Sequence, residues 1–370
     1  MSRGTPRRNR EENGFRGARR LSCGEVGVLS AKARAMSGPL LPATTTCWVL
    51  TDGKAGDEVQ CLGVAEALGL TPEIRRVAPR APWTWAMPWG PVDPREAPGR
   101  PDSPIRPPFP DLLIASGRRA VSSLRRVKRD SGGRTFTVFL KDPRTGAGTA
   151  DLIWVPRHDR LRGDNVLVTL TSPHRVSAAR LAAARAAPPP ALAALPRPRV
   201  ALLLGGDSRH HRFTASDIDR FTGLLERLAG EGVALMATAS RRSPPALAQR
   251  VAALVGQSGG SFWDGTGQNP YLPMLALADA IIVTADSVNM VGEACATGQP
   301  VFIFEPSERH PGSADKAKAY LRGLMDHGAV RFFDGHLESH AYEPLNSTPV
   351  IAAAIAERLP RHRIQHGMRS

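Results

Sequence analysis

Cysteine is scarce in this 370-residue chain, and its placement excludes two kinds of site. The four cysteines are Cys23, Cys47, Cys61 and Cys295, and no two of them form a CxxC pair. No histidine cluster accompanies them, so neither a structural zinc site nor a disulfide framework is expected. Cys47 and Cys295 fall in or beside apolar segments, which favours small core residues over nucleophiles. This use of cysteine fits the reducing cytoplasm, which is the predicted location.

Long apolar runs and nucleotide-binding fingerprints are also missing. No stretch approaches the roughly 18 apolar residues of a membrane span. Aromatic residues make up 5% of the chain and no RNA-binding or helix-turn-helix signature occurs, so dedicated nucleic-acid binding is not expected. No GxGxxG, Walker motif or Tyr-x-x-x-Lys pair is present, which disfavours an ATPase and an NAD-dependent epimerase. Without an acidic triplet or His/Cys ligand spacing, neither a metal nor a cofactor is predicted.

Positive charge is abundant, with a formal net charge of +15 carried mainly by arginine. Such a chain attracts nucleic acid, anionic lipid or phosphorylated substrates, and net charge does not choose among them. Residues 1–35 hold nine Arg or Lys against three Glu, and residues 1–43 show no sustained period. We expect 1–43 to be a disordered basic extension. An organelle transit peptide is one alternative, and a true start at Met36 is the interpretation we prefer.

Apolar strands and amphipathic helices alternate along the rest of the chain, which predicts an α/β fold of two Rossmann-like domains facing across a cleft. The expected domains are residues 44–187 and 199–345. A Pro-rich linker, 188–198, joins them, and 346–370 form a C-terminal helix and tail. The expected strands are 47–50, 73–77, 111–115, 135–140, 152–155, 166–170, 200–204, 233–238, 262–263, 280–284, 301–304 and 329–333.

The segment 280–306 predicts a βαβ unit with polar side chains at its strand-to-helix turn. Asp286 or Ser287 is expected to cap the helix, whose start favours a phosphate through its free amides and positive dipole. Glu293 lies two turns further on, and Glu305 follows the next strand. A carboxylate so placed can accept hydrogen bonds from both hydroxyls of a ribose. An ordinary α/β crossover with a capped helix is the alternative interpretation.

A glycine turn, Gly205-Gly206, follows the first strand of the second half and would let a phosphate approach the backbone closely. A simple tight turn is the alternative. Polar residues recur at the carboxyl ends of other strands, the edge at which open α/β sheets bind ligands. The predicted substrate-binding residues are Gly53, Lys54, Gly56, Gly117, Arg118, Arg144, His174, Gly205, Gly206, Asp207, Ser208, Ser240, Arg241, Asp286, Ser287, Asn289, Met290, Glu293 and Glu305.

A sugar transferase needs a carboxylate or histidine near the acceptor hydroxyl. In the first loop the candidates are Asp57 and Glu58, which could instead only cap the helix there. Across the sheet edge the candidates are His158 and Asp159. Catalysis by either pair is therefore left open.

Residues 78–110 are rich in proline and contain Trp83, Trp85 and Trp89, so they cannot be regular throughout. One interpretation is an irregular excursion with its indoles packed on the domain. The other is a hydrophobic contact with a membrane or an acceptor lipid.

Six motifs resemble the bacterial members of the family named after the plant elongated-mitochondria fission factor. They lie in the same order over about residues 47 to 335: TDGKAGDEVQCLGVAEAL, SGRR, LKDPR, VPRHDRLRGDNVLVTLTSPHRV, LLLGGDSRHHRF and TADSVNMVGEACATGQPVFIFEP. The family implies a fold similar to the two-domain glycosyltransferases with facing Rossmann halves. The second half also resembles the donor site of the enzyme that adds N-acetylglucosamine to lipid-linked peptidoglycan precursor. By that likeness Glu293 takes the ribose, and 205–208 with Ser287 the pyrophosphate.

Two functions follow from these patterns as hypotheses. The first is a metal-independent glycosyltransferase-like protein that binds a nucleotide diphosphate sugar and serves a membrane-associated or lipid-linked acceptor at the inner face of the membrane. The second is a non-catalytic adaptor, since the plant relative is thought to recruit a dynamin-like GTPase to mitochondria. The chain departs at one point from the N-acetylglucosamine-adding enzyme that it resembles. The first glycine-rich loop of that enzyme carries a histidine where this chain has Asp57 or Glu58. No oligomeric state is predicted.

Overall fold

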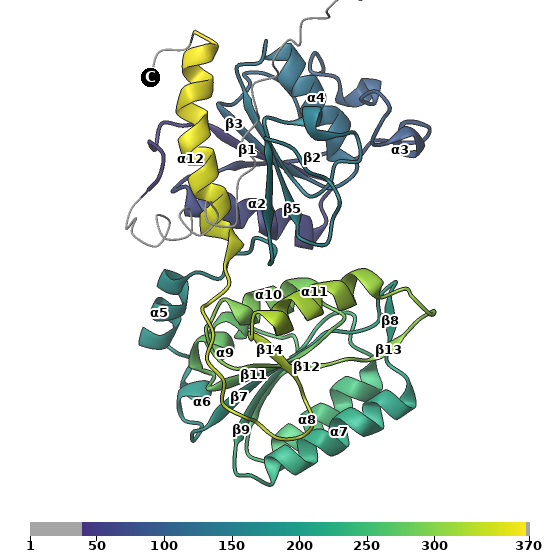
Figure 1. Ribbon diagram of the computed structural model, residues 1–370, viewed down its shortest axis with the longest axis vertical. Helices are drawn as coiled ribbons and strands as arrows, with labels where there is room; N and C mark the ends of the chain where they lie inside the picture. Colours follow the sequence, from purple (N-terminus) through teal and green to yellow (C-terminus); the bar gives the residue numbers. More distant parts are fainter. Residues whose placement is uncertain (1–38, 368–370) are drawn as a thin grey trace, which may run out of the picture.

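The computed structural model describes residues 39–367, which form two α/β domains stacked one above the other (Figure 1). The extension predicted for residues 1–38, with Cys23 and Met36, lies outside the described residues. Residues 39–43 belong to the extension predicted to be disordered, but two of them pack on the first domain. The amides of Leu40 and Leu41 both donate to the carbonyl of Leu68, and the Leu41 side chain is buried in the first domain. The first domain therefore begins before residue 43.

The first domain is built on a six-stranded parallel sheet in the order β2-β1-β3-β4-β5-β6. Val49 in the middle of β1 pairs with Ile74 on one side and Ile114 on the other. Continuous apolar runs form these strands because both faces of the sheet are buried. The strands are β1 Cys47–Thr51, β2 Glu73–Arg76, β3 Leu112–Ser116, β4 Phe136–Leu140, β5 Leu152–Pro156 and β6 Val166–Thr169.

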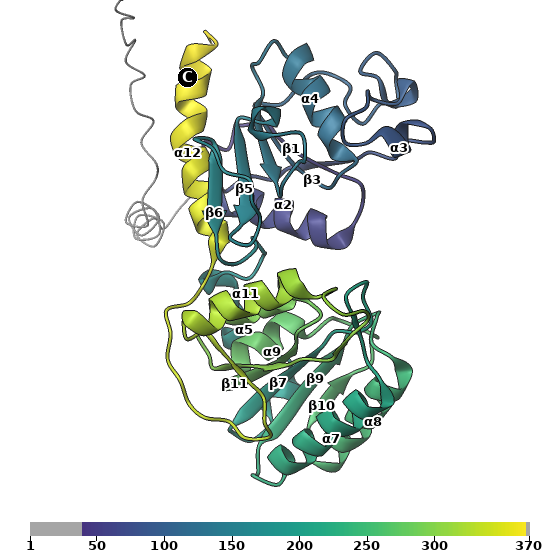
Figure 2. The ribbon, with the colours of Figure 1, turned by 45° about the vertical axis from the view of Figure 1, so that its right-hand side comes forward.

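Helices cover both faces of this sheet. One core cluster packs beneath α2, Ala55–Ala67, and the C-terminal helix α12, Ser347–Gln365; the other packs beneath α4, Ala120–Asp130. The Trp-rich excursion on the α4 side contains the short helix α3, Trp83–Ala86, and a 3₁₀ turn, Pro94–Glu96, while a second 3₁₀ turn, Ala147–Thr149, precedes β5. The chain thus returns from the second domain to complete the first (Figures 1 and 2).

The second domain repeats the design with the parallel order β10-β9-β7-β11-β12-β14. Its strands are β7 Arg199–Leu204, β9 Ala234–Ala239, β10 Ser261–Trp263, β11 Ala280–Thr284, β12 Val301–Phe304 and β14 Val330–Phe332. Helices α7, Ala215–Ala229, and α8, Pro245–Gln257, cover one face. Helices α9, Tyr271–Leu277, α10, Val288–Cys295, and α11, Asp315–Asp326, cover the other. A two-stranded antiparallel ribbon, β8 His211–Arg212 with β13 Ser307–Glu308, lies outside the sheet.

The linker between the domains also carries structure. Helix α5, Ala178–Ala186, precedes the predicted linker, and α6, Pro190–Ala193, lies inside it. Both helices contact α9, so this segment belongs to the surface of the second domain. The described helices include none that is long and apolar enough to cross a membrane.

The carboxyl ends of the two sheets face each other, as direct contacts between the domains show. Gln60 Nε2 in α2 donates to Asn289 Oδ1 in α10 at 3.2 Å. Lys316 Nζ in α11 lies 2.8 Å from Asp159 Oδ1, beyond the end of β5. The predicted fold class, an α/β fold of two facing Rossmann-like domains, is therefore confirmed.

Candidate functional site at the facing sheet edges

The start of α10 lies at the carboxyl end of β11 and faces the first domain. Val291, Ala294 and Cys295 are completely buried, which fixes the rotation of the helix about its axis. Asn289 in the first turn consequently reaches α2, where its amide nitrogen lies 3.2 Å from the position that a Cβ on Gly56 would take. The first-turn amides of α10 have no carbonyl partner within the helix, as at every helix start. This helix start is the feature of the second domain best suited to an anion.

Glu293 is held in place by a tyrosine that the sequence does not single out. Tyr271 donates its hydroxyl to Glu293 Oε2 at 2.5 Å. Burial raises the pKa of Glu293, and the Tyr271 hydrogen bond opposes that rise. Burial and the nearby carboxylate hold the pKa of Tyr271 well above its ordinary value, so the phenol keeps its proton and donates. Among the described residues no hydrogen bond reaches Glu293 Oε1, which is left as an acceptor.

The glycine turn at 205–208 already uses its own amides. Gly205 N donates to Thr284 Oγ1 at 2.7 Å, and Gly206 N donates to Asp286 Oδ2 at 2.8 Å. The next two amides donate to the carbonyls of Arg242 and His211, at 3.1 and 3.0 Å. A phosphate bound by these amides would have to displace all four partners. The predicted contact of this turn with a pyrophosphate therefore remains a prediction.

The structure gives another reason for two glycines at this turn. A Cβ on Gly205 would collide with the Asp286 carboxylate, and one on Gly206 would collide with the carbonyl oxygen of Arg242. The Asp286 side chain is completely buried and also contacts Arg242 Nη2 at 3.1 Å. Burial raises its pKa, and hydrogen bonds from Gly206 and Thr284 oppose the rise. Asp286 thus links β7, β11 and the loop after β9, and it does not cap α10.

The other predicted residues of this edge have mixed roles. Ser208 Oγ accepts from the amides of His210 and His211, at 3.1 and 3.0 Å. Ser240 Oγ lies 3.1 Å from Ser243 Oγ. Asp207 Oδ2 lies 3.7 Å from Arg309, and Arg241 is exposed. Ser287 makes no side-chain cap, and Met290 packs against the core. Glu305 Oε1 is buried without a partner.

In the first domain, Asp57 lies at the centre of a buried polar cluster. Its carboxylate pairs with Lys141 Nζ, and Ser116 Oγ donates to Asp57 Oδ1 at 3.2 Å. Gly117, with φ of +94°, lies against both Asp52 and Asp57, since a Cβ there would lie 3.3 and 3.2 Å from their carboxylate oxygens. Lys141 has φ of 115°, a strained value for a residue with a side chain. Strain at a sheet edge is typical of a functional site.

Of the other three predicted catalytic residues, two are engaged in ion pairs. Glu58 accepts two hydrogen bonds from Arg76, each 2.9 Å long, and Asp159 pairs with Lys316. His158 makes no hydrogen bond among the described residues, and its ring packs edge-on against Tyr320 with centroids 6.2 Å apart. Burial lowers the pKa of His158, so its imidazole is neutral at neutral pH.

His174 occupies the joint between α2, α12 and the loop after β6. Its side chain is 3% exposed, and its backbone exchanges two 2.8 Å hydrogen bonds with Thr348 Oγ1. Burial lowers the pKa of His174 to about 4. A substrate could reach this ring only if α12 moved away. The structure therefore places His174 in the core and not in the predicted binding surface.

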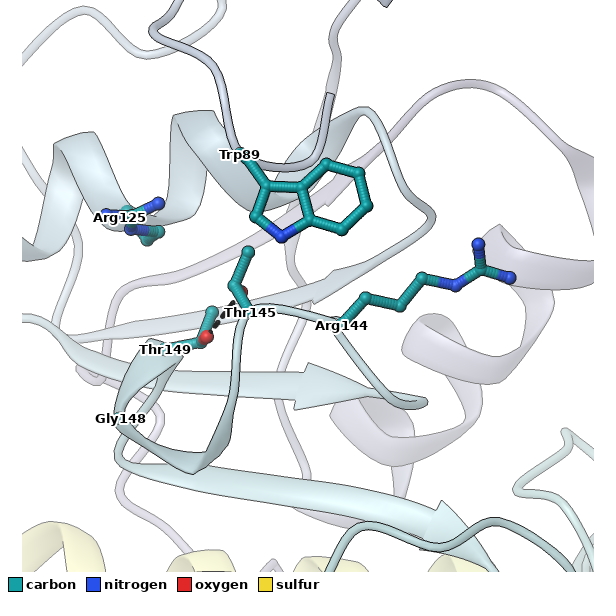
Figure 3. Close-up of a pocket in the computed structure, with 6 residues that line it drawn as sticks. All are labelled: Trp89, Arg125, Arg144, Thr145, Gly148 and Thr149. Atoms are coloured by element: carbon teal, nitrogen blue, oxygen red, sulfur yellow. Dashed lines mark hydrogen bonds between the residues drawn. The ribbon is translucent and has the colours of Figure 1, made fainter. Parts of the chain in front are cut away.

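The remaining predicted residues follow the carboxyl ends of β1, β3 and β4 in the first domain. Gly53, with φ of +79°, and Lys54, which pairs with Asp52 at 2.5 Å, form the first loop. Arg118 donates to the carbonyl of Thr84 at 2.9 Å. Arg144 lines a pocket of about 510 Å³ with Trp89 and Arg125 (Figure 3). Arg118 and Arg144 thus face the Trp-rich excursion.

Comparison with known proteins places the chain in a family. The family model described as "Mitochondrial fission ELM1" matches residues 55–359. The chain belongs to this family. The family membership predicted from the six motifs is thereby confirmed.

Two relatives illustrate the range of the family. "Mitochondrial fission protein ELM1" of Arabidopsis thaliana is 29% identical over 281 residues, which cover 68% of this chain and 64% of that protein. "Uncharacterized protein RP120" of Rickettsia prowazekii (strain Madrid E) is 29% identical over 166 residues, which cover 42% of this chain and 45% of that protein. The chain therefore spans less than two thirds of either relative.

Solved structures similar to the chain include a UDP-GlcNAc 2-epimerase, MurG and MnaA. UDP-GlcNAc 2-epimerase from Neisseria meningitidis bound to UDP-GlcNAc has a TM-score of 0.43 at 10% identity, covering 86% of this chain and 99% of that one. MurG of Acinetobacter baumannii has a TM-score of 0.43 at 16% identity, covering 87% and 94%. A complex of Staphylococcus aureus MnaA with UDP has a TM-score of 0.48 at 12% identity, covering 86% and 90%. No residue or activity is carried over at these values.

Proposed function

We propose that the protein binds a nucleoside diphosphate sugar at the start of α10 and transfers the sugar, without a metal ion, to an acceptor held by the first domain. The observation that carries the proposal is the pairing of Glu293 with Tyr271. This hydrogen bond orients the Glu293 carboxylate and leaves its Oε1 free to accept. Glu293 lies on α10, whose first turn contacts the first domain.

The donor would lie along α10. Its diphosphate would accept hydrogen bonds from the first-turn amides and from the Ser287 hydroxyl, which makes no cap hydrogen bond of its own. Glu293 would accept hydrogen bonds from the ribose hydroxyls, as predicted from its place on the helix. Among the described residues no three His, Cys, Asp or Glu side chains converge as they would around a metal ion. The helix start and nearby arginines would then balance the charge of the diphosphate.

His158 is the base that the geometry favours. Its ring packs against Tyr320, whose hydroxyl lies 3.4 Å from the carbonyl of Val288, the first residue of α10. In the proposed step, His158 takes the proton of the acceptor hydroxyl while the oxygen of that hydroxyl bonds to the anomeric carbon. The nucleoside diphosphate leaves with the electron pair of the broken glycosidic bond. Asp57, paired with Lys141, would then help to position the acceptor.

We propose further that the acceptor is membrane-associated and that the protein works in the cytoplasm at the inner face of the membrane. The basic composition and the exposed tryptophans of the first domain support this part of the proposal.

Isothermal titration with UDP, GDP and their sugars tests the donor site. We expect Glu293→Gln to weaken binding by about ten- to a hundredfold, because hydrogen bonds to a charged group contribute about 1.5–3 kcal/mol. Glu226→Gln, an exposed carboxylate on α7, is the matched control. His158→Gln should keep the affinity and lose any sugar transfer. No binding of any of these nucleotides at millimolar concentration would refute the proposal.

The adaptor remains the second candidate, and the glycine turn favours it. Its amides are satisfied within the chain, and the buried Asp286 carboxylate lies beside them. An adaptor of the fission family could keep this fold without a ligand. Equal rescue of a deletion strain by the wild type and by a Glu293→Gln, His158→Gln double variant would favour the adaptor.

A further inference from the structure

The Trp-rich excursion of the first domain is firmly anchored to the domain beneath it. Arg80 and Asp93 close its base through two hydrogen bonds of 2.9 and 3.0 Å, and the Asp93 side chain is 1% exposed. Met87 at its centre is also 1% exposed. Ser122 Oγ in α4 donates to the carbonyl of Gly90 at 2.6 Å. The excursion is therefore a fixed surface feature with its own buried contacts.

Two indoles nevertheless remain exposed on this anchored segment. Trp85 is 76% exposed and Trp89 is 65% exposed, whereas Trp48 and Trp154 in the sheet are buried. Figures 1 and 2 both place α3 at the outer side of the first domain, on the side away from α12. An indole left in water costs free energy that its burial would recover. The two exposed indoles, four residues apart in the sequence, indicate a surface that an apolar partner covers.

Arginines surround the second of these indoles. Trp89 and Arg125 together line two hollows of about 510 Å³ each. Arg144 lines the first hollow (Figure 3), and Arg126 and Arg129 line the second. Among the described residues, the guanidinium groups of Arg125 and Arg144 have no carboxylate partner.

The excursion and α4 together carry a net positive charge. Residues 78–130 contain ten Arg or Lys against five Asp or Glu. Two of these acids, Asp93 and Asp130, already pair with arginines of the same region. Lys128 also pairs with Asp151, so the cations available to an anionic partner are those without a carboxylate partner, such as Arg125 and Arg144.

We infer that the hollow lined by Trp89, Arg125 and Arg144, together with the exposed Trp85 on the same excursion, binds the surface of an anionic lipid bilayer. Tryptophan favours the interface between headgroups and acyl chains, and arginines beside it reach lipid phosphates. The anchored excursion supplies the apolar side chains of such a surface, and α4 and the loop after β4 supply the cations. This inference deepens the membrane part of the proposed function, and it does not depend on nucleotide binding.

Vesicle sedimentation with the full chain tests the inference. The probes are vesicles of phosphatidylcholine alone and of phosphatidylcholine with about 30% phosphatidylglycerol, at low and physiological salt. We expect binding to the anionic vesicles and a blue shift of tryptophan emission. The Trp85→Ala, Trp89→Ala double variant should bind at least about tenfold more weakly because it lacks the apolar area. Arg125→Glu should bind about 30-fold more weakly, since it changes the surface charge by two units.

Matched variants elsewhere on the molecule serve as controls. Phe332→Ala removes an exposed aromatic ring of the second domain, and Arg227→Glu reverses an exposed charge on α7. Both should bind like the wild type, and circular dichroism should show the same fold for every variant. Failure of the wild type to bind anionic vesicles, or equal binding by the wild type and the tryptophan double variant, would overturn the inference. Nucleotide titration of the same samples reports separately on the donor site.

Discussion

Acidification should loosen the joint between α12 and the rest of the first domain through one histidine. His174 is almost completely buried there, with Nδ1 accepting from the Val176 amide at 3.2 Å and Nε2 without a partner. Burial lowers its pKa to about 4 from an ordinary value of 6.5. The folded protein therefore holds the neutral ring in a pH range where the unfolded chain binds a proton.

The sign and size of the effect follow from this difference. Between about pH 6.5 and about pH 4 the unfolded state binds more protons, so the free energy of unfolding falls as the pH falls. The full difference corresponds to about 3 kcal/mol, and it is reached only when the pH approaches the folded pKa. Such a loss is large beside the roughly 5–15 kcal/mol that stabilise a typical domain.

Urea unfolding of the wild type and His174→Asn at several pH values measures the effect. Asparagine offers an acceptor to the Val176 amide and has no group that titrates in this range. The wild type should lose about 3 kcal/mol more than the variant between about pH 7 and about pH 4. Other histidines titrate in both proteins and cancel in the difference. Parallel loss of stability in the two proteins would refute the reasoning.

Three further predictions concern the facing sheet edges. Gly206→Ala should lower the free energy of unfolding by about 3 kcal/mol, measured in urea, because its Cβ collides with a carbonyl that cannot move freely. A double-mutant cycle of Asp159→Ala and Lys316→Ala should give a coupling of about 0.5 kcal/mol that shrinks in salt, since the lysine is 76% exposed. Lys141→Ala should destabilise more than Asp57→Asn, by roughly 2 kcal/mol in thermal or urea unfolding, because only the first leaves a buried carboxylate without its cation.

The sequence predicts the strands well because each is a short apolar run bounded by glycine, proline or polar residues. Val301–Phe304 and Ala280–Thr284 match their predicted bounds. The antiparallel ribbon of β8 and β13 is missed, since two-residue strands carry no periodic signal. His211 within that ribbon is buried, with both ring nitrogens unpartnered. Its partner strand lies almost a hundred residues further along the chain.

The site is harder to predict than the fold because its pairings join distant segments. Lys141 stands within a recognised motif, LKDPR, but nothing local indicates that it reaches Asp57, 84 residues earlier. Tyr271 and Glu293 belong to different helices and meet only after α9 and α10 pack on the sheet. The glycine turn shows the opposite difficulty. Its sequence favours a phosphate, whereas tertiary packing against Asp286 is a sufficient reason for both glycines.

The contacts between the domains bear on how a ligand at α10 would act. Asn289, in the first turn of α10, contacts Gln60 of the first domain, so a diphosphate at that turn would meet the interdomain contact directly. Tyr320 connects the same turn to His158 at the end of β5. If a ligand there changes the free energy of the domain contact, the contact changes the affinity of the ligand by the same amount. A ligand at α10 that alters the Gln60–Asn289 contact would therefore shift the relative position of the two domains, whether the protein used that shift to transfer a sugar or to present a surface to a partner.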